Sequence, residues 1–267
     1  MLFRSNVDAF DLLDVRSGTP GVAKVLQIGA TNGRLNLDGV TYTLDDIPFT
    51  NNLRGVSSPD ITLDVFNGRL TVDQANGGDV QGNVLVRAGS VFRIGTTGTG
   101  TEELLGLAGN GLVLGNVIVL NHFAPGLSPG TLTVTGDVTF LPTTVLDFEL
   151  DLGDMTVGGG VNDLLVLGGT TSDLTLDGIL NVTNYTGGTP TVNDFWVLMQ
   201  YDPSSTLTSN GLDLGLMPDI SGIGVWALNY GTAGAIRLEI VIPEPSTWAL
   251  LGVGFAAVGV LSRRRRS

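Results

Sequence analysis

Short segments of alternating apolar and polar residues fill the chain as far as residue 241, and Gly, Asn or Asp separates each segment from the next. A period of two is typical of half-buried β-strands. No segment before Ser246 has the spacing of an amphipathic helix. The pattern predicts strands at 84–86, 90–94, 115–120, 131–134, 138–141, 145–150, 164–167, 174–176, 195–200, 225–229 and 235–240.

One strand motif recurs along the chain. Residues 32–38 read NGRLNLD and return at 67–73 as NGRLTVD, and 177–182 repeat the theme more loosely as DGILNV. Evenly spaced short strands with Gly turns are typical of a solenoid or a sandwich. We predict an all-β body that is a right-handed parallel β-helix, in which each rung stacks its apolar positions on the next. A β-sandwich is the alternative.

Composition supports strands joined by tight turns, because glycine contributes 39 of the 267 residues and only 15% are charged. The formal net charge is −13, and twenty-five of the 26 acidic residues precede residue 243. An acidic body repels phosphate backbones, which excludes nucleic acid as a partner. Without Cys and with one histidine, His122, the chain has no thiolate site and no multi-His metal centre. We expect no cofactor.

Three chemically different blocks end the chain. Pro243, Glu244 and Pro245 hold an extended backbone that an enzyme can grip. An uncharged apolar stretch follows, which predicts a membrane helix at 247–262, about 25 Å long at 1.5 Å per residue against a hydrocarbon core of about 30 Å. Its lipid contacts are expected from Trp248, Leu250, Leu251, Phe255 and Leu261. The basic residues that keep this end cytoplasmic are Arg263, Arg264, Arg265 and Arg266.

This tail resembles the PEP-CTERM sorting signal of Gram-negative bacteria that make exopolysaccharide. The resemblance implies recognition of residues 243–245 by an exosortase, removal of the helix and arginines, a transient stay in the inner membrane, and final placement at the cell surface or outside the cell. Met1 to Pro20 carries three aspartates and no apolar run of an export signal. We therefore expect that the N-terminus is truncated.

A second resemblance concerns the body. Residues 123–134, FAPGLSPGTLTV, are similar to a rung of autotransporter passenger β-helices, and 162–166 and 195–198 resemble their later strands. The resemblance implies the C-terminal part of a β-helix, with Trp196 and Trp226 covering its last rung. The expected organisation is irregular solenoid rungs at 1–122, a passenger-like β-helix at 123–241 and the sorting signal at 242–267.

A possible serine nucleophile lies in the same rung, because residues 126–130 read GLSPG and match the G-x-S-x-G elbow around Ser128. The elbow uses the amide after the serine as an oxyanion donor and needs a helix to follow. Pro129 has no amide hydrogen, so a turn between rungs explains the letters better. We expect His122 at a strand end, without a special role. The Gly-rich stretches 95–100 and 109–115 are interpreted as turns.

Four acidic residues are the weak candidates for a metal site: Asp147, Glu149, Asp151 and Asp154. Carboxylate oxygens are calcium ligands, but three of these acids alternate with apolar residues, as on a strand with a solvated outer face. Threonine pairs at 41 and 43, 131 to 135, and 206 and 208 would suit ice binding only if they stacked in register. Their spacing is irregular.

The predicted function is that of an exported, non-enzymatic surface or matrix protein with a structural or adhesive role linked to exopolysaccharide and biofilm. The alternative is a β-helix polysaccharide lyase or hydrolase, which needs clustered carboxylates or a basic residue in a groove. The body contains a single lysine, Lys24. Ice binding is a weaker alternative.

Overall fold

A computed structural model gives the fold, and it describes residues 82–95 and 97–242 in full together with the backbone of five earlier strands. The earlier strands are β1 (Lys24–Ala30), β2 (Arg34–Leu37), β3 (Val40–Thr43), β4 (Ile61–Phe66) and β5 (Arg69–Val72). The described residues form strands and contain no helix, which confirms the all-β prediction. Among these residues, none lies in a helix that could cross a membrane.

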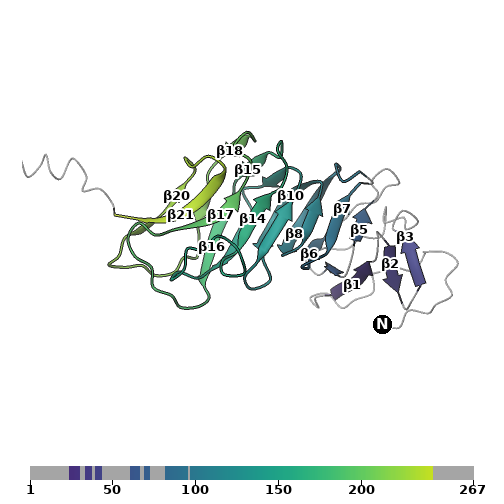
Figure 1. The fold of residues 1–267 in the computed structure, drawn as a ribbon, viewed down its shortest axis with the longest axis horizontal. Coiled ribbons are helices and arrows are strands. Elements are labelled where there is room, and N and C mark those ends of the chain that lie inside the picture. Colours follow the sequence, from purple (N-terminus) through teal and green to yellow (C-terminus); the bar gives the residue numbers. More distant parts are fainter. Residues whose placement is uncertain are drawn as a thin grey trace, which may run out of the picture.

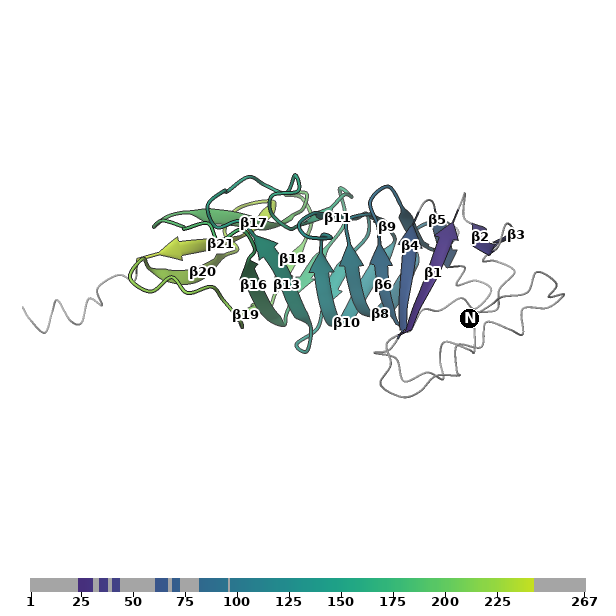
Figure 2. The same ribbon diagram turned by 90° about the horizontal axis from the view of Figure 1, so that it is seen from below.

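The larger sheet has thirteen strands and runs in the order β18-β15-β12-β10-β8-β6-β4-β1-β2-β3, with β13, β16 and β19 branching from β10. Beyond β4 its members are β6 (Asn83–Val86), β8 (Thr101–Gly109), β10 (Asn116–Pro125), β12 (Val138–Phe140), β13 (Val145–Leu150), β15 (Leu174–Leu176), β16 (Ile179–Asn184), β18 (Leu207–Ser209) and β19 (Asp213–Leu214). Figure 2 shows β4, β6, β8 and β10 side by side in this sheet.

The second sheet has eight strands in the order β20-β21-β17-β14-β11-β9-β7-β5. Beyond β5 its members are β7 (Val91–Ile94), β9 (Leu112–Leu114), β11 (Thr131–Val134), β14 (Leu164–Leu167), β17 (Phe195–Gln200), β20 (Val225–Asn229) and β21 (Ala235–Val241). From β4 to β12 the chain alternates between the two sheets, and each strand pairs in parallel with a strand of the previous turn. This curled, parallel arrangement, elongated in Figure 1, is consistent with the predicted solenoid.

The core lies between the two sheets, and in most strands from β6 to β13 every second residue contributes to it. In β13 the buried and half-buried positions alternate along the whole strand, as the period of two predicts. The rings of Phe123 and Phe140 meet edge to face with centroids 4.8 Å apart, and Phe148 lies 6.3 Å from Phe123. Aromatic residues of consecutive turns thus pack against one another between the two sheets.

The pairing changes at the C-terminal end. The last parallel strand of the second sheet, β17, pairs antiparallel with β21, which pairs antiparallel with β20. Trp196 of β17 is 1% exposed and packs against the partly buried Trp226 of β20, with ring centroids 5.8 Å apart. The two tryptophans predicted to cover the last rung do lie together at this end, although Trp196 is itself part of the core.

Each strand predicted from residue 84 onward is present, with its ends shifted by at most a few residues except at β10. Two expectations were wrong. The interpretation of 109–115 as a turn fails because Leu112–Leu114 form β9, and the long strand β8 was not predicted. His122 lies inside β10 and not at a strand end. In each case pairing with the neighbouring turn extends a strand across residues that alternate poorly.

Candidate functional site

The predicted sorting signal lies outside the described residues, which end at Ile242, directly after β21. The structure therefore gives no positions for the residues of the signal, Pro243, Glu244, Pro245, Trp248, Leu250, Leu251, Phe255, Leu261, Arg263, Arg264, Arg265 and Arg266. The candidate sites described below belong to the body.

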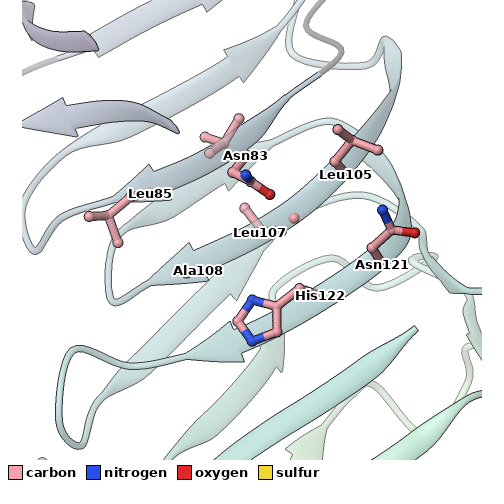
Figure 3. A pocket seen from close by; sticks show the side chains of 9 residues that line it. Asn83, Leu85, Leu105, Leu107, Ala108, Asn121 and His122 are labelled. Atoms are coloured by element: carbon pink, nitrogen blue, oxygen red, sulfur yellow. The ribbon is translucent and has the colours of Figure 1, made fainter. Parts of the chain in front are cut away.

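A hollow of about 440 Å³ opens on the outer face of the larger sheet. Asn83 and Leu85 of β6, Leu105 of β8, and Asn121 and His122 of β10 are among its lining residues (Figure 3). Asn83, Gly106 and His122 occupy one register row across three strands. Gly106 contributes to the hollow because it has no side chain, and a Cβ there would clash with Oδ1 of Asn83.

A bulge in β10 shapes the rim of this hollow. Val119 pairs with Leu104 and His122 pairs with Gly106, so two residues of β10 face one residue of β8. Beyond the bulge β10 leaves β12 and pairs with β13. Bulges turn side chains away from the regular alternation. Asn121 and His122 are consecutive and both are exposed, which a regular strand would not allow.

His122 is held in place by a chain of hydrogen bonds across the neighbouring strands. Its Nε2 atom lies 2.7 Å from Oδ2 of Asp147, and the two side chains are 49% and 45% exposed. Nδ2 of Asn181 donates to Oδ1 of the same carboxylate at 2.8 Å. The amide of Leu216 donates to Oδ1 of Asn181 at 2.7 Å. The imidazole is thus oriented before any ligand arrives.

The four calcium candidates do not converge. Asp147 pairs with His122, and Oδ1 of Asp151 accepts from the amide of Gly153 at 2.8 Å. Hydrogen bonds from the side chain and amide of Thr156 hold the pKa of Asp154 below its usual value. No group of three or more His, Asp or Glu side chains arranged for a metal ion occurs in the described part of the chain.

Asn162 organises the loop that carries these acids. Its Oδ1 accepts from the amide of Asp151 at 2.7 Å, and its Nδ2 donates to the carbonyls of Asp154 and Thr156 at 2.8 and 2.7 Å. The side chain is 1% exposed. The loop after β13 is therefore closed by a buried side-chain amide.

The next residue, Asp163, carries a buried carboxylate that is 3% exposed. Its Oδ1 and Oδ2 atoms accept from the amides of Gly130 and Glu149 at 2.8 and 2.7 Å. Burial raises the pKa of Asp163 to about 7, although these two hydrogen bonds favour the charged form. Sequence analysis treated residues 162–166 only as the start of a strand and missed this role.

Ser128 lies on the exposed turn between β10 and β11, with φ at 55°. A strand follows it where the nucleophile elbow requires a helix, and the next residue, Pro129, has no amide hydrogen to act as an oxyanion donor. The structure thus favours the turn interpretation of the GLSPG letters. The threonine pairs also separate, since Thr131 and Thr133 belong to the second sheet and Thr208 to the larger one, so these do not form one flat ladder.

Several residues of the hollow gave no signal in the sequence. Asn83, Gly106 and Asn121 are small or amide residues within ordinary strand segments. The consecutive polar residues Asn121 and His122 directly follow the strand predicted at 115–120, and this break in the alternation is the trace of the bulge.

Two comparisons with known proteins gave matches. Residues 241–266 match the PEP-CTERM protein-sorting motif. A segment of 127 residues, 46% of this chain, is 35% identical to the adhesin BmaC autotransporter of Brucella suis biovar 1 (strain 1330). The aligned segment covers 3% of that adhesin's length. No solved structure gave a significant match.

Proposed function

We propose that this chain is an exported protein of a Gram-negative cell surface or extracellular matrix, delivered by an exosortase. The observation that carries the proposal is the sorting-motif match over residues 241–266. It begins at the end of β21, so the motif directly follows the folded body. In this proposal the apolar segment holds the protein in the inner membrane until the exosortase cuts near residues 243–245.

The body's role is structural or adhesive. The similarity to an autotransporter adhesin supports this part of the proposal. We further propose that the body is a right-handed parallel β-helix, since successive turns pair in parallel and alternate between two sheets. Stacked turns make a long, stiff body that can project from a surface. The link to exopolysaccharide and biofilm is drawn from the resemblance of the tail.

The proposed role involves no catalysis. Among the described residues, the lining of the hollow holds one group suited to acid–base chemistry, His122, and no carboxylate, lysine or arginine to act as a second one. Incubating the protein with acidic polysaccharides and following ultraviolet absorbance would detect the unsaturated products of a lyase. Their appearance would favour the enzymatic alternative.

The sorting step is tested by mass spectrometry of the C-terminus in a host that carries an exosortase and in the same host without it. We expect the recovered protein to lack Arg263–Arg266 only where the exosortase is present. The double variant Pro243→Ala/Pro245→Ala should keep its arginines, whereas Pro203→Ala, an exposed proline of the body, should be trimmed normally. An intact tail in the exosortase-bearing host would overturn the proposal.

A further inference from the structure

We infer that the hollow between β6, β8 and β10 binds a neutral pyranose unit of a polysaccharide chain. This inference deepens the proposed surface role and rests on it for its biological meaning only. The binding itself is measured on protein that no exosortase has processed. The hollow is lined by both apolar and polar side chains. A pyranose ring presents an apolar C–H face and a rim of hydroxyl groups, so its site needs an apolar floor with polar groups around it.

The floor and the rim are both present. The half-buried side chains of Leu85, Leu105 and Ala108 offer apolar surface (Figure 3). Asn83 and His122 are the register partners of Gly106 on the two neighbouring strands. The volume of about 440 Å³ falls within the range of about 300 to 1,000 Å³ for small-molecule sites. The missing side chain at Gly106 leaves room for a ring between the leucines and the imidazole.

The rim groups match hydroxyl chemistry. Each asparagine side chain both donates and accepts hydrogen bonds, as a sugar hydroxyl does. In His122, Nε2 is engaged by Asp147, which leaves Nδ1 as the ring nitrogen that can reach a ligand. Because Asn181 fixes Asp147 in turn, the imidazole loses little freedom on binding.

The charge pattern selects a neutral polymer over an acidic one. The described lining carries no lysine or arginine to pair with a carboxylate or sulfate. The carboxylate of Asp147 lies directly beside His122, and the chain as a whole has a net charge of −13. Both would repel an anionic ligand.

The exposed position of the hollow favours a polysaccharide chain over a free sugar. The hollow opens on the outer face of the sheet, and the hydrogen-bonded row continues from His122 through Asp147 to Asn181 on the following strands. A linear polymer can lie along this row with one unit in the hollow, whereas a free monosaccharide would use only one part of it.

The test is titration of the full-length protein, in a detergent without a sugar headgroup, with two neutral hexasaccharides, cellohexaose and chitohexaose. Calorimetry measures affinity, and the side-chain amide resonances of Asn83 and Asn121 report contact at the hollow. We expect saturable binding of at least one hexasaccharide with a dissociation constant at or below the millimolar range. The exposed-residue variants Asn121→Ala and His122→Ala should weaken it at least ten-fold, and Gly106→Ala should do so by displacing Asn83.

The matched control is Thr183→Ala, which changes an exposed residue of β16 on the same sheet and should bind within two-fold of the parent protein. Circular dichroism confirms that each variant keeps its strands. The inference is overturned if neither hexasaccharide binds, if the variants bind as well as the parent, or if trigalacturonate binds more tightly than both neutral ligands. Each of these results leaves the C-terminal trimming experiment unaffected, so a failure here is separable from a failure of the proposed function.

Discussion

The Oδ1 atom of Asp163 accepts a 2.8 Å hydrogen bond from the amide of Gly130, thirty-three residues earlier in the chain. Its Oδ2 atom accepts from the amide of Glu149 in β13 at 2.7 Å. One buried carboxylate thus joins the turn before β11, the strand β13 and the start of β14. The two passenger-like segments, 123–134 and 162–166, are therefore parts of one structural unit, because the aspartate of the second completes the turn of the first.

Replacing this carboxylate should be costly. Asp163→Ala leaves two buried amides without acceptors, at about 1 to 3 kcal/mol each, so we expect the free energy of unfolding to fall by about 3 kcal/mol. Asp173 offers a matched control, since its carboxylate accepts from the amide of Thr206 at an exposed position. Asp173→Ala should cost less than about 1 kcal/mol in urea unfolding followed by circular dichroism. Equal losses in the two variants would contradict the role assigned to Asp163.

The same residue should make stability depend on pH. The pKa of Asp163 is raised by burial to about 7 in the folded protein, so folding favours the protonated form. The stabilisation is complete below the unfolded value near 3.8 and is lost as pH rises through about 7. We therefore expect the parent protein to lose stability relative to Asp163→Asn between pH 5 and pH 8, by about 1 to 3 kcal/mol. Urea midpoints at the two pH values measure this difference, and parallel changes in both proteins would refute it.

The strands could be predicted from sequence because their signal is local. Alternation with period two places Val145 to Leu150 in a strand whatever the rest of the chain does, and the strand is found there. Alternation is a weaker guide where a strand forms through pairing with strands of the neighbouring turns. Gly109 and Gly115 suggested a turn, yet the three residues Leu112–Leu114 pair with β7 and β11 and become β9. Pairing between turns overrides the local preference there.

The site could not be predicted because its parts come from different turns. The register row joins Asn83, Gly106 and His122, which are separated by about twenty residues each and meet only through parallel pairing. Similarly, the acids at 147 to 154 suggested calcium by residue type alone, whereas the loop that carries them is closed by the side chain of Asn162. Residue types can be read from the sequence, but strand register and burial decide which of those residues contact one another.

Gly126 should tolerate alanine much less well than a matched glycine. Its φ of 94° is strained for any other residue, and a Cβ there would clash with Oδ1 of Asp163. Gly187 has a similar φ of 77° but nothing within 4 Å of the added Cβ. We expect Gly187→Ala to cost about 1 to 2 kcal/mol from strain alone, and Gly126→Ala at least about 2 kcal/mol more. Chemical unfolding of both variants distinguishes the two costs, and similar losses would show that Asp163 moves aside freely.

The two tryptophans at the C-terminal end should contribute unequally to stability. Trp196 is 1% exposed and donates from Nε1 to the carbonyl of Asp151 at 3.0 Å, whereas Trp226 is partly buried and donates to Pro218 at 2.9 Å. Trp196→Ala should lower the free energy of unfolding by about 3 to 5 kcal/mol, and Trp226→Ala by about half as much.

The loss of Trp226 should have a second effect that stability alone does not predict. Its ring holds the antiparallel pair β20 and β21 against β17, and without this packing the edge of β17 becomes accessible to other chains. We expect Trp226→Ala to form oligomers on size-exclusion chromatography at concentrations where Val225→Ala, an exposed change on the same strand, stays at the size of the parent protein. If Trp226→Ala elutes as the parent does, backbone pairing of β21 alone is enough to protect the end of the solenoid.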